Sequence, residues 1–277
     1  MKSFKRLLVV QDDSPQCDIW TKQAANLAKQ WGADILGLYV EPEVIRRTYY
    51  DSAIGDNLEQ VQNSLEDHRK KRLFQKFNET LKDFDIQSDW ITARGDPIIE
   101  ARRLARYTDL SVLGYPQNAS HDLNNLRHIV EYVAVGSGCP TLVIPCVFSE
   151  NVKMDKIAIC WDGSREAVRA LHDALELLAQ ARSVDVLIAN ENDASRPQIS
   201  GEQLKKLLHT HAIETTVHEL PLTHRNAGKD LLAKTTELGS QMIVLGAYGH
   251  SRLRDLILGG VTQHMLKHST IPLFLSH

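Results

Sequence analysis

The sequence predicts an α/β protein of two tandem, doubly wound domains, each a five-stranded parallel sheet with helices on both faces. Three observations predict this. The strand-like runs are short and apolar without alternation, which is typical of parallel strands covered on both faces. Segments with helical periodicity separate these runs, as in βαβ units. The same order of predicted strands and helices occurs twice along the 277 residues.

The first half supplies five predicted strands, each an apolar run of strand length. They lie near Arg6–Gln11, Asp34–Val40, Ile86–Thr92, Leu110–Gly114 and Thr141–Ile144. Apolar residues at helical spacing predict helices between them, near Cys17–Trp31, Leu58–Phe84, Pro97–Tyr107 and Leu123–Gly136. An extra stretch, Pro42 to Gly55, is expected to be a loop between the second strand and the second helix.

The second half repeats this alternation without the extra stretch. Its strands are predicted near Lys156–Trp161, Val184–Asn190, Glu214–Leu220, Met242–Gly246 and Pro272–Leu275. Its helices are predicted near Arg165–Ala181, Gly201–His211, Ala227–Leu238 and Val261–His268. The sequence Asp162-Gly163-Ser164 is turn chemistry in which Ser164 can cap the first of these helices.

Residue matches between the halves indicate an internal repeat of domain size. Asp12 aligns with Asp162 near the start of each half. Near the end of each half, Pro140 aligns with Pro272, and this pair is offset by 132 residues. The polar, aperiodic stretch between the repeats predicts a linker. We therefore expect domains at residues 1–147 and 155–277, joined by a linker at 148–154.

Composition excludes several classes of function. A hydrophobic share of 43%, a charged share of 24% and a formal charge of −3 are those of a globular protein without a polyanion-binding surface. No apolar run is long enough for a signal peptide or a membrane span. The four cysteines form no C-x-x-C pair and the histidines form no H-E-x-x-H motif. We expect a cytoplasmic protein with no metal site, no nucleic-acid partner and no membrane partner.

A glycine-rich run follows the predicted strand Met242–Gly246. Gly246 and Gly249 stand three apart, and nine residues separate Gly249 from the pair Gly259-Gly260. A helical pattern starts directly afterwards, at Val261. Bare backbone N–H groups leading into a helix N-terminus favour phosphate binding. Two ordinary loop turns would give the same glycines, and spacing alone does not decide between the two.

This run resembles the nucleotide-binding signature of the universal stress protein family, glycine, two residues, glycine, nine residues, glycine, then serine or threonine. Gly246, Gly249 and Gly259 match it, whereas Gly260 stands where serine or threonine is usual. The resemblance covers nearly the whole chain as two tandem domains. It is weaker in the first half, where it rests on strand order, Gly95-Asp96-Pro97 and the closing strand. It implies the adenine nucleotide alpha hydrolase-like, Rossmann-like fold.

The resemblance also implies a ligand, ATP or its products ADP and AMP, with or without Mg²⁺. The ligand would lie where the winding of the sheet reverses, between the first and fourth strands of the second half. Asp162 would accept hydrogen bonds from the nucleoside, and Ala189 would offer its backbone to the adenine edge. The residues expected to line the site are Asp162, Ala189, Gly246, Gly249, Gly259, Gly260, Val261 and Thr262.

The first half lacks these glycines. The offset of 132 residues places Gln117, Arg127 and His128 at the positions of Gly249, Gly259 and Gly260. Side chains therefore stand at the positions where a phosphate would have to approach the backbone closely. We expect this pocket to be closed to nucleotide or altered for another ligand.

No catalytic constellation is present. There is no Walker lysine after the glycines and no G-x-S-x-G elbow. We therefore expect a nucleotide-binding stress-response regulator rather than a dedicated enzyme. Two alternatives stay open: an interaction or scaffold protein with an empty or differently occupied pocket, and a slow ATP hydrolase. The protein partners and a homodimer are also left open by the sequence.

One expectation concerns how the halves meet. The closing strands Thr141–Ile144 and Pro272–Leu275 would each leave an open sheet edge if the halves were separate. We expect these edges to pair, so that the two halves pack with pseudo-two-fold symmetry.

Overall fold

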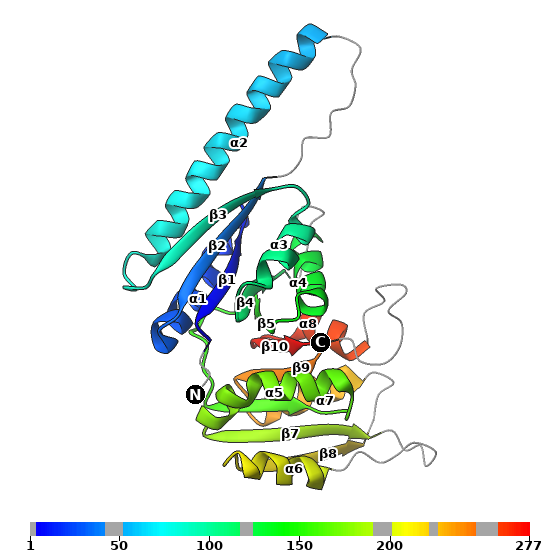
Figure 1. Cartoon of the computed structure of the whole chain (residues 1–277). Helices are drawn as coiled ribbons and strands as arrows, with labels where there is room; N and C mark the ends of the chain where they lie inside the picture. The colour runs from blue at the N-terminus through cyan, green and yellow to red at the C-terminus, as the bar shows by residue number, and fades with distance from the viewer. Residues whose placement is uncertain (1–3, 42–51, 117–123, 191–200, 222–226, 248–259) are drawn as a thin grey trace.

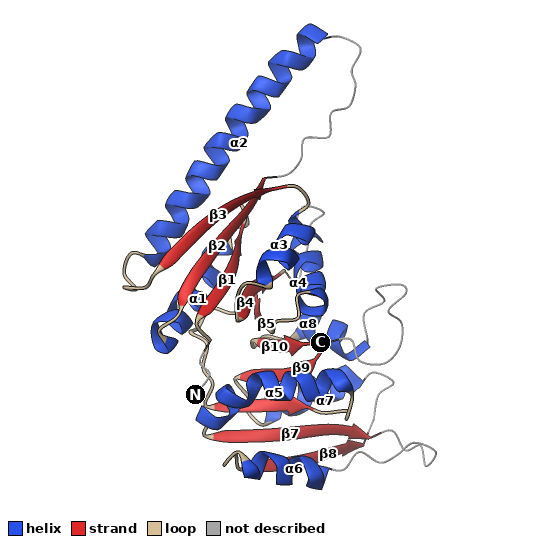
Figure 2. Cartoon of the chain, in the orientation of Figure 1, coloured by secondary structure: helices blue, strands red, loops and turns tan. Residues whose placement is uncertain are grey.

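The computed structural model describes residues 4–41, 52–116, 124–190, 201–221, 227–247 and 260–277. Within these ranges the strands form one ten-stranded sheet in the order β3-β2-β1-β4-β5-β10-β9-β6-β7-β8 (Figures 1 and 2). The order reads the same from both ends, five strands from each half. The predicted α/β class with two doubly wound halves is confirmed.

In the first half the chain alternates strands and helices as predicted. The elements are β1 (Arg6–Gln11), α1 (Cys17–Trp31), β2 (Asp34–Glu41), α2 (Ser52–Leu81), β3 (Ser88–Arg94), α3 (Pro97–Ala105), β4 (Leu110–Tyr115), α4 (Asn124–Gly136) and β5 (Thr141–Pro145). All four strand pairs of this half are parallel. Helix α1 packs with α2, and α3 packs with α4, so that each pair covers one face of the sheet.

The second half repeats this arrangement. Its elements are β6 (Lys156–Cys160), α5 (Arg165–Gln180), β7 (Ser183–Asn190), α6 (Gly201–Thr210), β8 (Thr215–Pro221), α7 (Ala227–Glu237), β9 (Met242–Gly246), α8 (Gly260–His268) and β10 (Leu273–Ser276). The strands of this half are also parallel to one another.

In the first half, Asp96 caps α3 by accepting hydrogen bonds from the N–H groups of Ile98 and Ile99, in keeping with Pro97 at the first helical position.

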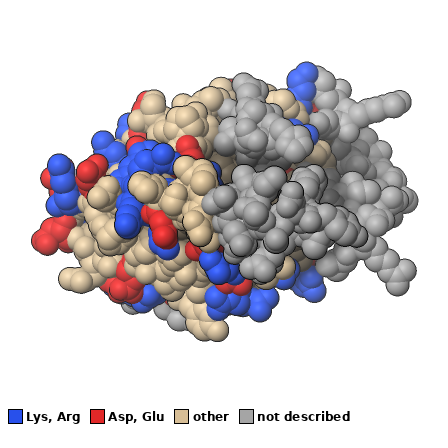
Figure 3. Space-filling model, turned by 90° about the horizontal axis from the view of Figure 1, so that it is seen from above, with Lys and Arg blue, Asp and Glu red and all other residues tan. Residues whose placement is uncertain are grey.

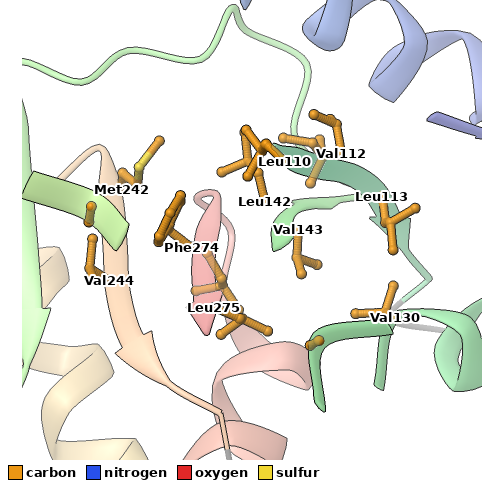
Figure 4. Close-up of a cluster of buried hydrophobic side chains, with 14 of the residues drawn as sticks. Leu110, Val112, Leu113, Val130, Leu142, Val143, Met242, Val244, Phe274 and Leu275 are labelled. Carbon is orange, nitrogen blue, oxygen red and sulfur yellow. The ribbon is translucent and has the colours of Figure 1, made fainter. Parts of the chain in front are cut away.

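The halves join through the antiparallel pair β5–β10, in which Leu142 lies opposite Phe274 and Val143 opposite Leu273. Apolar side chains from both halves meet around this pair (Figure 4). Phe274 is fully buried and its ring also lies 6.3 Å from that of Phe4. The expected pairing of the two closing edges is confirmed, and it makes the two predicted sheets continuous.

Two side chains of α1 bond to the linker: Asn26 donates to Asn151 Oδ1 at 3.1 Å, and Gln23 makes two further bonds. The amide of Gln23, on α1, donates to the carbonyl oxygen of Glu150 at 2.8 Å and accepts from the N–H of Val152 at 3.0 Å. No helix or strand lies between β5 and β6. The linker thus lies against α1 while β5 and β10 hold the two halves together.

Several predicted boundaries were wrong, and those of α2 and β3 are instructive. Helix α2 begins at Ser52 rather than Leu58, so the expected loop Pro42–Gly55 overlaps its first turn. Strand β3 begins at Ser88 rather than Ile86, because its register is set by β2, where Ile35 pairs with Ser88. Pairing across the sheet rather than local apolar content decides where this edge strand starts.

No helix in the described ranges is long and apolar enough to cross a membrane. On the face seen in Figure 3, the described basic and acidic side chains are interspersed rather than gathered by sign.

Candidate functional site

The winding of the second half reverses beside β6, which pairs with β7 on one side and β9 on the other. Cys160, the last residue of β6, lies beside Leu245 of β9. Asp162 follows β6 by two residues and Gly246 ends β9. The fold therefore brings these two predicted site residues to the same sheet edge, at the switch point where α/β sheets bind ligands.

Asp162 is held in a tight turn. Its Oδ1 accepts the N–H of Ser164 at 2.9 Å, and Ser164 Oγ accepts the N–H of Ala167 at 3.1 Å, which caps α5. The predicted turn and cap are confirmed. The Asp162 side chain is exposed at this edge. Ala189, half-buried near the end of β7, pairs with Leu220 of β8. The nucleoside contacts of Asp162 and Ala189 stay predictions.

Gly246 has a packing role that the sequence did not indicate. A Cβ placed on it would lie 2.5 Å from the backbone nitrogen of Ala167 and 2.5 Å from the carbonyl carbon of Glu166. These are backbone atoms of α5, which cannot give way as a flexible side chain would. Glycine is therefore required at 246 for α5 to pack on β9, whatever the residue does for a ligand.

The first turn of α8 lies next to the end of β9. The Thr262 side chain is buried, and its hydroxyl lies 3.5 Å from the carbonyl oxygen of Gly246. Ala247 is held by the last two residues of the chain. Its N–H donates to the carbonyl oxygen of Ser276 at 2.7 Å, and its own carbonyl oxygen lies 2.7 Å from His277 Nδ1. The start of the glycine-rich run is thus tied to β10 and to α8.

Gly260 begins α8 and is exposed, and a Cβ placed on it would meet no heavy atom of the described residues within 4 Å. Its φ does not lie in the left-handed region. Val261 follows it and is half-buried. The two remaining predicted site residues, Gly249 and Gly259, lie outside the described residues. The described part of the site therefore brings the first turn of α8 to the end of β9, next to the strand that leads into the Asp162 turn.

The corresponding place in the first half is filled by the chain itself. Arg127, which aligns with Gly259, lies within helix α4. Its Nε donates to the carbonyl oxygen of Pro116 at 2.8 Å, and its guanidinium carbon lies 5.7 Å from the centre of the Tyr115 ring. Tyr115 ends β4, and the offset of 132 residues aligns it with Ala247, directly after β9. The expectation of a first pocket altered by side chains agrees with this arrangement, and Tyr115 is a part of it that the sequence did not indicate.

Asp12 repeats the turn of Asp162 in a different environment. Its Oδ1 accepts the N–H of Ser14 at 2.7 Å, whereas its Oδ2 is buried and has no hydrogen-bond partner among the residues that the structure describes. Burial raises the pKa of the Asp12 carboxyl, and the hydrogen bonds from Ser14 oppose that shift. The neighbouring Asp13 accepts bonds from Arg69 and Arg72 of α2, which lower the pKa of its carboxyl.

These sites can now be set beside known proteins. The family model for the universal stress protein family matches residues 3–145 and again 153–277. The chain belongs to this family, as two tandem copies of its domain. Universal stress protein Slr1230 of Synechocystis sp. (strain ATCC 27184 / PCC 6803 / Kazusa) is 23% identical over 288 residues, covering 97% of this chain and 98% of that protein.

Solved structures resemble the whole chain as well. A universal stress protein from Archaeoglobus fulgidus DSM 4304 covers 98% of this chain and 95% of its own, with 18% identity and a TM-score of 0.75. A protein of unknown function from Pseudomonas aeruginosa PAO1 covers 99% and 92%, with 13% identity and a TM-score of 0.57. At these identities the likeness concerns the fold.

Proposed function

We propose that the second half binds one adenine nucleotide between the Asp162 turn and the start of α8, and that the protein acts as a nucleotide-dependent stress-response regulator. Members of the family bind adenine nucleotides, and the structure of one universal stress protein is a complex with cAMP. That complex is a property of that protein.

The observation that carries the proposal is the contrast between Gly260 and Arg127. At the start of α8, a Cβ on Gly260 would meet no heavy atom of the described residues within 4 Å. At the aligned place in the first half, the Arg127 side chain lies over the ring of Tyr115 and bonds to Pro116. A phosphate needs close access to backbone N–H groups. The side chain of Arg127 at the aligned place in the first half therefore favours the second half as the binding half.

The donors present fit the two ends of a nucleotide. The first N–H groups of α8 have no partner within their own helix, and the helix dipole adds partial positive charge there. Asp162 supplies an exposed carboxylate one strand away, suited to the hydroxyl or amino groups of a nucleoside. The expected contacts of Gly249, Gly259, Val261 and Thr262 with the phosphates belong to this proposal, as does the backbone contact of Ala189 with adenine.

A regulatory use of the nucleotide suits this arrangement better than a dedicated catalytic one. Phosphoryl transfer needs groups that stabilise charge on the transferred phosphoryl and orient a nucleophile. The start of α8 offers backbone N–H donors, which suit phosphate binding. We propose that binding of the nucleotide to this site, and not its hydrolysis, provides the regulatory signal.

Mass spectrometry of small molecules released from protein purified without added nucleotide tests the proposal. We expect ATP, ADP or AMP in an amount approaching one per chain, or, if the protein is recovered empty, saturable binding of radiolabelled ATP. A different bound molecule, or no ATP binding by folded protein, would contradict it. Phosphate release from ATP is measured in parallel, and rapid release abolished by Asp162→Asn would favour the hydrolase alternative.

A further inference from the structure

Helix α5 starts at the candidate site and continues to the junction between the two halves. Its first turn is capped by Ser164, in the turn that also holds Asp162. The helix packs on β9 and on β10, the strand that joins the second half to the first (Figure 1). One helix of the second half is therefore in contact both with the proposed nucleotide site and with the strand at the junction.

Arg169, in the second turn of α5, reaches across this junction. A terminal guanidinium nitrogen donates to the carbonyl oxygen of Gly138, in the first half, at 3.0 Å, and Nε donates to Asp173 Oδ2 at 2.9 Å. The same oxygen of Asp173 accepts the hydroxyl of Ser276, on β10, at 2.8 Å. These bonds tie α5 both to a loop of the first half and to the last strand of the second half.

The loop that accepts the bond from α5 is held in place by the first half. Gly138 lies between α4 and β5, with a φ of 81°, in the left-handed region that favours glycine. Before it, the carbonyl oxygen of Gly136 accepts a bond from Arg106 of α3 at 3.1 Å. After it, the N–H of Cys139 donates to Ser137 Oγ at 3.1 Å. The carbonyl of Gly138 is therefore a fixed acceptor for a donor from the other half.

The repeat does not return this bond from the first half to the second. The offset of 150 residues that relates Asp12 to Asp162 places Ile19 of α1 at the position of Arg169. An isoleucine side chain has no hydrogen-bond donor. The helix that carries the bridge is therefore the one that starts in the half with the glycine-rich run.

We propose that Arg169 is a positioning residue for the nucleotide site. By bonding to Gly138, it uses the first half to hold α5, and with it the Asp162 turn, in the place that the nucleotide requires. This role rests on the nucleotide binding proposed for the second half. Because coupling between two equilibria is reciprocal, a nucleotide bound at the start of α5 stabilises the bridge by the same factor. Nucleotide binding in the second half thereby strengthens a contact with the first.

The thiol of Cys139 lies at this bridge. It is half-buried, and burial raises its pKa together with the nearby carboxylates of Asp109 in the first half and Asp173 in the second. The guanidinium of Arg169 lowers the same pKa. Groups from both halves therefore surround this thiol, and its reactivity reports on the contact between them.

Thiol labelling of Cys139 measures the response of the bridge to nucleotide. Cys17 and Cys160 are buried, so that Cys139 is the partly exposed cysteine left in the variant Cys146→Ser. Its rate of reaction with dithionitrobenzoate is measured at fixed pH with and without saturating ATP. We expect ATP to slow the reaction about fivefold, at the lower end of couplings between sites. The ratio of the two rates is compared between variants, because a change of thiol pKa that a substitution causes cancels in it.

Arg169→Gln removes the bridge. In the labelling background it should weaken ATP binding about fivefold in a calorimetric titration and bring the ratio of labelling rates close to one. Arg169→Lys, which can still donate to the carbonyl of Gly138, should recover part of both effects. The matched control is Arg103→Gln, which removes an arginine that pairs with Glu100 on α3. It should leave the affinity and the ratio unchanged, and thermal unfolding checks that each variant is folded.

Parent-like ATP affinity in Arg169→Gln, or a labelling ratio that survives this substitution, would overturn the role of Arg169 and leave the proposed nucleotide site intact. Equal losses in Arg103→Gln would overturn it too. A loss of thermal stability alone in Arg169→Gln would show that the bridge only joins the halves. A folded parent chain that binds no ATP would contradict the proposed function itself, and the positioning role with it.

Discussion

Gly246 lies so close to helix α5 that a Cβ on it would stand 2.5 Å from the backbone nitrogen of Ala167. The residue at the end of β9 therefore sets how closely α5 approaches the sheet. The same helix begins at the turn that holds Asp162. Packing at Gly246 thus positions both sides of the candidate site.

Replacing Gly246 with alanine is expected to destabilise the protein. The added methyl group meets backbone atoms of α5, and overpacking of this kind costs about 1–3 kcal/mol. Gly260→Ala is the matched control, because the same methyl group there meets no heavy atom within 4 Å. Urea unfolding should show a loss for Gly246→Ala and no loss for Gly260→Ala. Equal stability of the two variants would show that α5 moves away without cost.

Gly260→Ser is expected to tighten ATP binding. The substitution restores the hydroxyl usual at this place in the family signature, and neither the backbone φ nor the surroundings oppose it. A hydrogen bond to a charged oxygen is worth about 1.5–3 kcal/mol, or roughly tenfold or more in affinity. Calorimetric titration measures the change, with Gly260→Ala as the variant without a hydroxyl. Unchanged affinity for ATP, ADP and AMP would mean that residue 260 does not face the phosphates.

Gly259→Arg is expected to abolish nucleotide binding while the protein stays folded. It copies the residue of the first half, where Arg127 occupies the aligned place. A side chain at 259 would take the space of a phosphate. Equilibrium dialysis with labelled ATP measures the loss, and thermal unfolding checks the fold. Parent-like affinity in the folded variant would place the phosphates elsewhere.

Asp12→Asn is expected to stabilise the protein at neutral pH. Burial raises the pKa of the Asp12 carboxyl above its ordinary value of 3.8. Because the folded state then binds the proton more tightly than the unfolded state, this group opposes folding increasingly as pH rises through the raised pKa. The asparagine side chain carries no charge, and its amide oxygen can still accept the bond from Ser14.

The gain in melting temperature from Asp12→Asn should be present at pH 7 and should vanish below about pH 3.8, the unfolded reference value. Asp162→Asn is the control, because Asp162 makes the same turn with an exposed side chain. It should show no comparable gain. A gain from Asp12→Asn that persists unchanged at pH 3 would contradict burial of the charge as its cause.

Local sequence patterns predicted the bounds of helices and strands well where a single periodic or apolar run defines the element. Cys17–Trp31 and Met242–Gly246 have the predicted bounds because each is a clear periodic or apolar run. The start of α2 was missed because Gly55, Asp56 and Asn57, which have low helix propensity, stand in its first turns. The pairing of β5 with β10 was predicted because two apolar edges in a tandem repeat need a partner.

Local sequence patterns predicted less of the candidate site than of the helices and strands. The glycine spacing indicated a ligand position, but the clash that an added Cβ at Gly246 would make with α5 depends on how a helix and a strand approach. The placement of Arg127 over Tyr115 likewise joins residues of two elements. Tertiary contacts of this kind leave no local signal. The alignment of Arg127 with Gly259 indicated only that the first half differs.

The central claim is that each chain binds one adenine nucleotide, in its second half. Isothermal titration of nucleotide-free protein with ATP tests it most directly, run in parallel on the parent chain, Gly259→Arg and Asp162→Asn. The account predicts a stoichiometry near one for the parent, no binding by Gly259→Arg and weakened binding by Asp162→Asn. Two equal sites per chain, or one site that survives Gly259→Arg unchanged, would contradict it.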